Sequence, residues 1–330
     1  MRVAPPTWKL WTALGIVYVV WGSTYLAIRY AVESLPPLLS AAVRFALAAA
    51  VLAGYLLVRR GPTALRASRR QHGSAALIGL LLLLGGNGGV TLAERRGLPS
   101  GLTALLVASV PLWVVLLRAT SRDRPTRQTL LGVAVGFAGV AVLLAPGSRE
   151  GSAPAWSALI VVGASFSWSV GSFLSSRWDL PPDPLLGAVS QMAGGAVGLA
   201  LCGGLLRERL VWADVQVSSL IALGYLVIFG SLVAFTAYSW LLRVAPVSKV
   251  STYAYVNPVV AVVLGAAFVG ESLTALSFFG GALTLVAVAI VVGEESRRRS
   301  RAPLVTPPEI AVDRRQPPAD EHGRDRSSAT

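Results

Sequence analysis

The sequence is poor in the residues that stabilise soluble domains or hold metals. Its one cysteine, Cys202, lies in an apolar run, which excludes a disulfide framework and a thiolate metal site. Its two histidines, His72 and His322, lie outside the apolar runs. Charged residues make up only 14% of the chain and apolar residues 54%, and the mean hydropathy is +0.64. This composition is typical of an integral membrane protein.

Ten apolar segments are each near the roughly 20 residues that a helix needs to cross about 30 Å of hydrocarbon. The first has no small-residue cleavage site and has a counterpart in mid-chain, so we interpret it as a permanent span and not as a signal peptide. The ten predicted spans cover about residues 10–30, 37–58, 74–94, 98–118, 128–145, 155–176, 184–206, 217–242, 247–270 and 273–293.

The 29 arginines and lysines indicate how these spans are oriented. When the N-terminus is placed inside, 22 of them fall on the inner side and six on the outer side, and only Arg44 lies within a span. Basic residues favour the cytoplasmic side, so both termini should be cytoplasmic and the protein should lie in the cell membrane. Because the net charge of +13 consists of these topology signals, we expect no nucleic-acid partner.

A duplication organises the chain. Residues 245–271 lie on residues 98–124 after a shift of 147 positions, with two prolines coinciding, and the same shift places Trp168 on Trp21. Each half then has five spans, and an odd number forces the halves into opposite orientations. The alternative to a duplication is that the two halves match only because all hydrophobic helices have similar sequences. We expect an all-α integral membrane fold of ten transmembrane helices in two inverted five-helix repeats: N-terminus 1–9, repeats 10–145 and 146–293, and a disordered basic cytoplasmic tail 294–330.

Polar and aromatic side chains recur on one face of several spans at the helical period. Such stripes suit a wet cavity or a neighbouring helix better than lipid. Interhelical packing, with serine hydroxyls bonded to their own backbone, is the alternative. In the first span the stripe is Tyr18, Trp21, Tyr25 and Arg29; in the sixth it is Ser165, Trp168, Ser172 and Ser176; in the ninth it is Ser248, Ser251, Thr252 and Tyr255, with Tyr253 and Asn257 pointing elsewhere.

These stripes predict a substrate cavity near the midplane between the two repeats. Pro111 and Pro258 should kink the fourth and ninth helices, because each removes a helical donor, although both could be tolerated with neighbouring hydroxyls as partners. The glycine-rich run 85–89 should loosen the third span. The predicted cavity residues are Trp21, Tyr25, Asn87, Trp168, Ser172, Gln191, Tyr238, Ser251, Thr252, Tyr255 and Asn257.

Arg44 is the one charge deep in an apolar run, so it needs a partner or hydration. Glu94, at the outer end of the third span, is the candidate partner in an outer gate. Alternatively, Glu94 could pair locally with Arg95 or Arg96. Arg44 could instead snorkel to the membrane interface or form a purely structural ion pair. Because Glu94 and Glu271 lie near the outer face, we expect both to stay hydrated and ionised. Transport would then be facilitated diffusion, or be coupled through a group other than a central carboxylate.

Several motifs together resemble the EamA family of the drug/metabolite transporter superfamily. The resemblance implies ten helices, cytoplasmic termini and export of small metabolites, amino acids or toxic compounds without ATP. The second half departs from the first where Gln191 replaces Arg44 and where Trp168-Ser169-Val170 replaces Trp21-Gly22-Ser23. The motifs are Trp21-Gly22-Ser23-Thr24-Tyr25, Ala42-Val43-Arg44-Phe45-Ala46-Leu47-Ala48, Glu94 with Leu98-Pro99-Ser100-Gly101-Leu102, Val110-Pro111-Leu112, and Asn257-Pro258 leading to Gly270-Glu271.

Other function classes fit the sequence less well. An enzyme would need a nucleophile, a base or a metal cluster near the bilayer. No Asp or His lies within a span, and Glu occurs only at span ends. A channel or a receptor remains the alternative to a transporter. We expect no cofactor and no metal, a neutral, zwitterionic or aromatic small-molecule substrate, the lipid bilayer as surroundings, and a monomer or homodimer.

Overall fold

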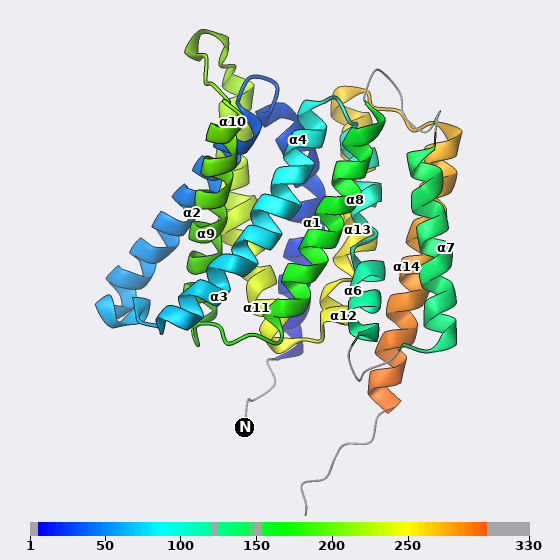
Figure 1. Cartoon of the computed structure of the whole chain (residues 1–330), viewed down its shortest axis with the longest axis horizontal. Coiled ribbons are helices and arrows are strands. Elements are labelled where there is room, and N and C mark those ends of the chain that lie inside the picture. Colours follow the sequence, from blue (N-terminus) through cyan, green and yellow to red (C-terminus); the bar gives the residue numbers. More distant parts are fainter. Residues whose placement is uncertain (1–5, 121–124, 146, 148–153, 302–330) are drawn as a thin grey trace, which may run out of the picture.

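The computed structural model describes residues 6–120, 125–145, 147 and 154–301. Within these residues every regular element is a helix (Figure 1). Nine of the helical segments described are long and apolar enough to cross a membrane, and Tyr253–Val269 is a shorter apolar helix at the position of the ninth predicted span. The chain is therefore an all-helical integral membrane protein.

Successive membrane spans run alternately up and down in Figure 1, so that α1 begins and α14 ends at the same end of the bundle. We call this the lower end and the opposite one the upper end, after their places in Figure 1. The elements are α1 (Thr7–Ala31), α2 (Pro37–Arg60), η1 (Pro62–Leu65), α3 (Arg69–Gly79), η2 (Leu80–Gly88), α4 (Gly89–Arg95), α5 (Ser100–Val107), α6 (Val110–Ala119), α7 (Arg127–Leu144), α8 (Ala155–Ser175), α9 (Pro184–Leu205), η3 (Trp212–Asp214), α10 (Val217–Tyr225), η4 (Leu226–Phe235), α11 (Thr236–Val244), α12 (Val247–Val250), α13 (Tyr253–Val269) and α14 (Ala275–Arg301).

The third and eighth spans are not α-helical throughout. Each changes in its middle to a π-helix, η2 or η4, and then returns to an α-helix. The glycine-rich run lies largely in η2, as expected of a loosened segment, whereas η4 contains only Gly230. Wider π turns are uncommon and recur at functional sites, so these two stretches are positions where backbone groups can turn toward neighbouring helices.

The fourth and ninth spans are both interrupted. α5 gives way to α6 at Ala108 and Ser109, and Pro111 is the second residue of α6, where its missing N–H fits the first turn of the new helix. In the ninth span the interruption lies at Ser251 and Thr252, and α13 then continues as a helix through Pro258. The interruption of this span therefore precedes its proline by more than a turn.

Close helix packing depends on small residues. A Cβ at Gly139 of α7 would lie 2.4 Å from the Thr284 hydroxyl and 2.9 Å from the Gly280 carbonyl oxygen of α14, so only glycine permits this approach. α2 and α9 form a second extensive helix contact. Large apolar side chains such as Leu131, Phe278 and Ile290 are more than half exposed on the outside of the bundle, where lipid replaces water.

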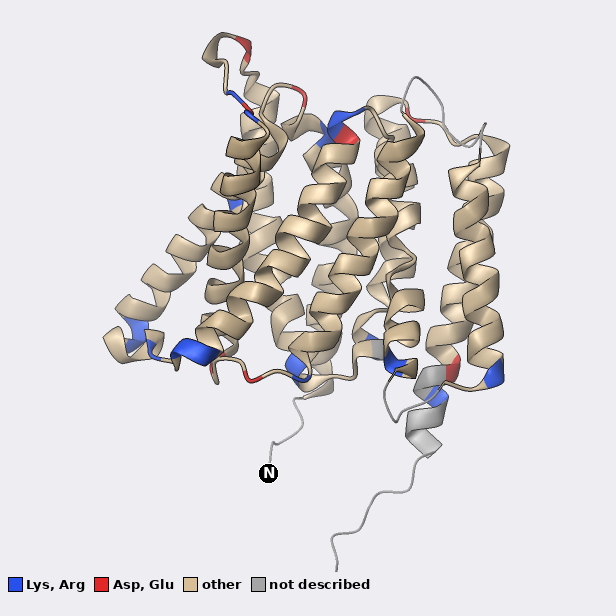
Figure 2. Cartoon of the chain, in the orientation of Figure 1, with Lys and Arg blue, Asp and Glu red and all other residues tan. Residues whose placement is uncertain are grey.

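Lysine and arginine gather at the lower end of the bundle, and few lie at the upper end (Figure 2). The predicted disordered tail begins too early, because α14 continues through residues 294–301 to Arg301. The remainder of that tail, 302–330, lies outside the described residues.

Candidate functional site

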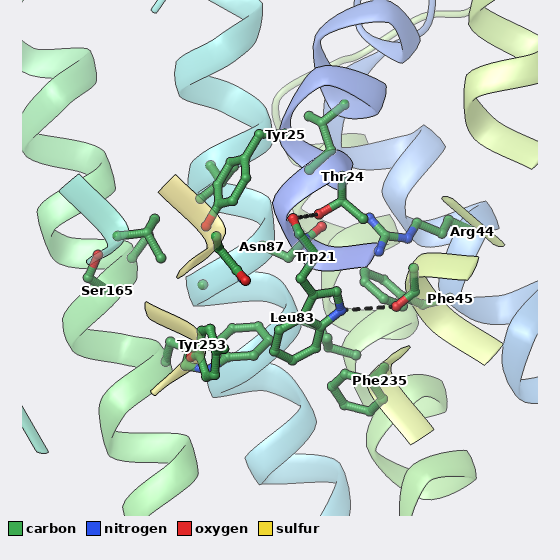
Figure 3. Close-up of a pocket in the computed structure, with 18 residues that line it drawn as sticks. Trp21, Thr24, Tyr25, Arg44, Phe45, Leu83, Asn87, Ser165, Phe235 and Tyr253 are labelled. Carbon is green, nitrogen blue, oxygen red and sulfur yellow. Dashed lines mark hydrogen bonds between the residues drawn. The ribbon is translucent and has the colours of Figure 1, made fainter. Parts of the chain in front are cut away.

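A cavity of about 60 Å³ lies between α1, α2, η2, α8, η4 and α13 (Figure 3). Its wall is mainly apolar and aromatic, with a few polar groups. Of the residues predicted from the sequence, the structure brings six to this wall: Trp21, Tyr25, Arg44, Asn87, Trp168 and Asn257.

Four aromatic side chains pack edge to face or tilted at one side of the cavity: Trp21, Trp168, Tyr238 and Tyr253, which we call the aromatic cluster. The Trp21 ring centroid lies 5.3 Å from that of Trp168, 4.7 Å from that of Tyr238 and 5.4 Å from that of Tyr253. These separations fall in the range of favourable aromatic pairs. The cluster therefore offers preformed ring faces and edges to a solute.

Hydrogen bonds fix the orientation of these rings. Trp21 Nε1 donates to the Gly230 carbonyl oxygen at 3.2 Å, an acceptor within the π-helical stretch η4. Trp168 Nε1 donates to the Tyr238 hydroxyl at 3.1 Å, and Ser172 Oγ lies 2.6 Å from the same hydroxyl. Both indole N–H groups are thus satisfied, and little rotational freedom has to be lost when a ligand binds.

Arg44 reaches the cavity wall with only 4% of its surface exposed. Its Nε donates to Ser231 Oγ at 2.8 Å, and its guanidinium carbon lies 4.6 Å from the centre of the Phe45 ring. No acid among the described residues lies within ion-pair distance of it. The predicted Arg44–Glu94 pair is therefore wrong: Ser231 holds the guanidinium, which leaves a positive charge in the cavity wall.

Glu94 is also placed differently from the prediction. It is 1% exposed, and neither carboxyl oxygen has a hydrogen-bond partner among the described residues. The local alternative fails as well, because Arg95 donates to the carbonyl oxygens of Val32 and Glu33 and Arg96 stacks over Trp156. The expectation of a hydrated Glu94 is wrong, since depth along the helix does not reveal which neighbouring segments cover the side chain.

The two asparagines at the cavity present different groups. Asn87 Oδ1 has no hydrogen-bond partner among the described residues, and Figure 3 shows this side chain next to Tyr25. Asn257 has its nitrogen assigned toward the carbonyl oxygens of Tyr18 and Tyr253, at 2.9 and 3.1 Å, because both neighbours are acceptors. Asn87 is thus available to a ligand, whereas Asn257 stabilises the start of α13.

Six predicted residues do not line the cavity. Tyr238 belongs to the aromatic cluster but does not line the cavity, and Ser172 is hydrogen-bonded to its hydroxyl. Gln191 accepts a hydrogen bond from Ser239 at 3.3 Å. Ser251 and Thr252 lie at the interruption of the ninth span, and Thr252 Oγ1 is 2.5 Å from the Tyr18 hydroxyl. Tyr255 packs instead against the apolar cluster that contains Leu112.

The sequence missed several wall residues, above all Tyr253, but also Thr24, Phe45, Phe235 and Ser165 of the predicted stripe. The stripe of the ninth span assumed one continuous helix. Because the chain breaks at Ser251 and Thr252, the helical phase starts again at Tyr253, and Tyr253 with Asn257 faces the cavity. Their spacing of four residues was the signal that could have found them.

Two carboxylates cap helices at the upper end. Glu271 accepts from the Ser100 N–H (2.9 Å), the Ser100 hydroxyl (2.8 Å) and the Gly101 N–H (3.1 Å) at the N-terminus of α5. Glu208 accepts from the N–H groups of Leu38 and Leu39 at the N-terminus of α2. Each of these contacts, the Glu271 cap and the Glu208 cap, satisfies free N–H groups and joins parts of the chain about 170 residues apart.

The cavity favours non-covalent binding of a small solute. Within the part of the chain that the structure describes, no group of three or more His, Cys, Asp and Glu side chains is placed to hold a metal ion. The wall combines ring faces, one guanidinium and one free amide oxygen, and no carboxylate of a described residue lines it.

Known proteins resemble this chain over most of its length. The model of the EamA-like transporter family matches residues 8–145 and again residues 155–293. The Escherichia coli (strain K12) protein named "Uncharacterized inner membrane transporter YedA" is 39% identical over 282 residues, covering 86% of this chain and 90% of that protein. A Salmonella typhimurium protein named "Probable amino-acid metabolite efflux pump" is 26% identical over 87% of this chain and 96% of its own length. One crystal structure, 23% identical, covers 90% of this chain with a TM-score of 0.63 and shares the fold.

Proposed function

The chain belongs to the EamA-like transporter family, and on that premise we propose that it is a secondary transporter of the inner membrane. It exports small metabolites, amino acids or drug-like solutes by alternating access through the central cavity. The observation that carries the proposal is the composition of the cavity wall, which takes equivalent tryptophans, Trp21 and Trp168, from the two segments that match the family.

An inverted repeat is supported by the pattern of helix contacts. α1 packs against α13 and η4, and its counterpart α8 packs against α5, α6 and η2, which are the matching elements of the other half. The π-helical stretches η2 and η4 also coincide, to within one residue, after the shift of 147 positions. A cavity between two such halves can open to either side when one half rocks against the other.

The cavity must widen during transport. Small-molecule sites usually have volumes of ~300–1,000 Å³, and a cavity of about 60 Å³ has room for only a few waters. At the upper end the Glu208 and Glu271 caps hold the helices together. Because both caps consist of hydrogen bonds that water can replace, they are suited to open and close in each cycle.

The lower end is the cytoplasmic side in this proposal, because the basic residues gather there. Export then means entry of the solute from the lower end and release at the upper end, after the caps have opened.

The wall chemistry favours solutes with an aromatic or apolar part and a carboxylate or neutral polar part. The aromatic cluster supplies apolar and π contacts, and Arg44 supplies the positive charge. Strong cations are disfavoured, because none of the described residues that line the cavity is a carboxylate and Arg44 would repel them. The name of the Salmonella relative makes amino-acid metabolites the first class to test.

Counterflow tests the proposal. Metabolomics first compares the medium of overexpressing cells with that of deletion cells. Each solute whose concentration differs between the two media is then tested in proteoliposomes that contain the purified full-length protein. The twenty common amino acids are tested in the same way. We expect saturable uptake of labelled solute into vesicles preloaded with the unlabelled form. Uptake that never saturates would indicate a channel, and absence of uptake for every solute would refute the transporter.

Trp21→Ala, with the exposed Trp8→Ala as matched control, shows whether this uptake uses the central cavity. The proposal expects loss of counterflow in the first variant and normal counterflow in the second.

A further inference from the structure

Glu94 is a buried acid that the proposed cavity does not use. It lies at the end of α4, in the upper half of the bundle, and only 1% of its surface is exposed. Its carboxyl oxygens have neither a hydrogen-bond donor nor an ion-pair partner among the described residues. A carboxylate in such surroundings is strongly disfavoured compared with the neutral acid, so a proton on Glu94 stabilises this arrangement.

The charged groups around Glu94 act in opposite directions. On α1, Arg29 favours a negative charge on Glu94, and Tyr25 is the titratable neighbour. Beside the N-terminus of α5, Glu271 disfavours that charge. The other helices packed against α4 have little electrostatic effect on Glu94, because α8 and η2 carry no ionisable residue and Arg44 of α2 is bonded to Ser231. Arg95, on α4 itself, is bonded to backbone carbonyl groups.

Two of these neighbours connect Glu94 to the transport machinery. Glu271 forms the cap that closes the upper end over α5. Tyr25 lines the central cavity, and Figure 3 shows its ring at the cavity edge beside Asn87. A change of charge on Glu94 therefore acts on the upper closure and on the solute cavity at once.

We propose that Glu94 is a proton-binding site that couples export to proton entry, an inference that rests on the proposed transport function. With a proton on its carboxyl group, Glu94 is neutral, does not repel Glu271, and the Glu271 cap closes. Without the proton, two carboxylates share one apolar region, and opening the upper end lowers their repulsion by admitting water.

Glu94 binds and releases one proton in each transport cycle. A Glu94 carboxylate in the upper-open state takes one proton from water on the upper side, which allows the Glu271 cap to close. After the cavity opens to the lower side, the O–H bond of Glu94 breaks and the proton leaves to water in the cavity past Tyr25. Each cycle thus moves one proton from the upper to the lower side while one solute moves the other way.

Infrared spectroscopy of the purified full-length protein in nanodiscs tests the proton site without any solute. The C=O stretch of a protonated carboxyl group is separate from the bands of carboxylates and amides. At about pH 7, where exposed acids are ionised, wild type should show this band and Glu94→Gln should lose it. Glu33→Gln, which changes an exposed acid of the loop after α1, is the control and should keep the band.

Cysteine labelling from the upper side tests the link to the cap. Ile28→Cys, at a buried wall position of the cavity, is combined with Cys202→Ala and labelled by a membrane-impermeant thiol reagent from about pH 5 to about pH 9. Rates are divided by those of the exposed Asp214→Cys, which corrects for ionisation of the thiol. The normalised rate should rise with pH, by at most about tenfold per pH unit for a one-proton linkage. In the Glu94→Gln variant the normalised labelling rate should be low and independent of pH. In the Glu33→Gln variant it should depend on pH as in the wild type.

The outcomes separate the two proposals. An unchanged carboxyl band in Glu94→Gln, or the same pH dependence of labelling with and without this substitution, overturns the proton site. Saturable counterflow without a proton gradient would in that case still support the transporter. Both predicted changes in Glu94→Gln, found with wild-type protein that shows counterflow, support a proton site on Glu94 that controls the upper closure.

Discussion

At the scale of single residues, Arg44 and Glu94 do not form the predicted ion pair. They occupy neighbouring helices, yet Arg44 is held by Ser231, and the Glu94 carboxyl group has no hydrogen-bond partner among the residues that the structure describes. Burying an unpaired charge is costly, so such groups persist where function needs them. The two proposals accordingly assign them separate roles, Arg44 in binding the solute and Glu94 in binding a proton.

Arg44 can be tested by comparing two substitutions. Arg44→Ala removes the charge and the bond to Ser231, whereas Arg44→Lys keeps the charge. Because a hydrogen bond to a charged group contributes ~1.5–3 kcal/mol, Arg44→Ala should raise the KM for a carboxylate-bearing solute by about tenfold or more. Arg44→Lys should raise it less, and the exposed Arg59→Ala should leave it unchanged. Equal effects of alanine and lysine in proteoliposome uptake would contradict a role for the charge.

Single cysteines test which face of α13 meets the solute. In a Cys202→Ala background, a transported solute should protect Trp21→Cys and Tyr253→Cys from a small thiol reagent. Tyr255→Cys, two residues along the same helix but outside the cavity, should be insensitive. Protection of Tyr255→Cys and not of Tyr253→Cys would show that the ninth helix faces the solute as the continuous stripe predicted.

At the scale of helices, interruptions and π turns shape the site. The break at Ser251 and Thr252 selects Tyr253 for the cavity, and η4 supplies the Gly230 carbonyl that orients Trp21. Neither feature follows from hydrophobic periodicity, because a period describes a regular helix, and these positions lie where the helix is irregular.

The contact between α7 and α14 depends on a glycine. Gly139→Leu would force side-chain atoms into Thr284 and the Gly280 carbonyl, at a cost of ~1–3 kcal/mol or more. We expect a lower yield of monodisperse protein and a lower melting temperature, as measured by size-exclusion chromatography and thermal unfolding. Gly163→Leu, on α8 with open space around its Cβ position, is the matched control and should be tolerated. Similar stability of the two variants would show that the close approach is unimportant.

At the scale of the whole molecule, membership in the EamA-like transporter family confirms the resemblance read from the motifs. The inverted arrangement of the two repeats and the cytoplasmic position of both termini stay predictions. They depend on the odd number of spans per half and on the basic residues at the lower end.

Reporter fusions test this topology directly. A reporter that is active only outside the cytoplasm should be active when it is fused after Gly147, which follows α7 at the upper end. The same reporter should be inactive when it is fused at the C-terminus. Reporters on the same side at both positions would exclude five spans in the second half, and with them the inverted repeat.

The sequence by itself determined the membrane class, the positions of the helices, the family, and the tryptophans at the centre of each half. These properties depend on local hydrophobicity, charge and repeated motifs, all of which can be identified directly in the amino-acid sequence. The tertiary structure alone decided that Glu94 is covered, that Arg44 bonds to Ser231, and that Tyr253 replaces Tyr255 at the cavity. Those outcomes depend on contacts between segments up to about 200 residues apart and on the phase of a helix after a break, because burial is a property of neighbours in space.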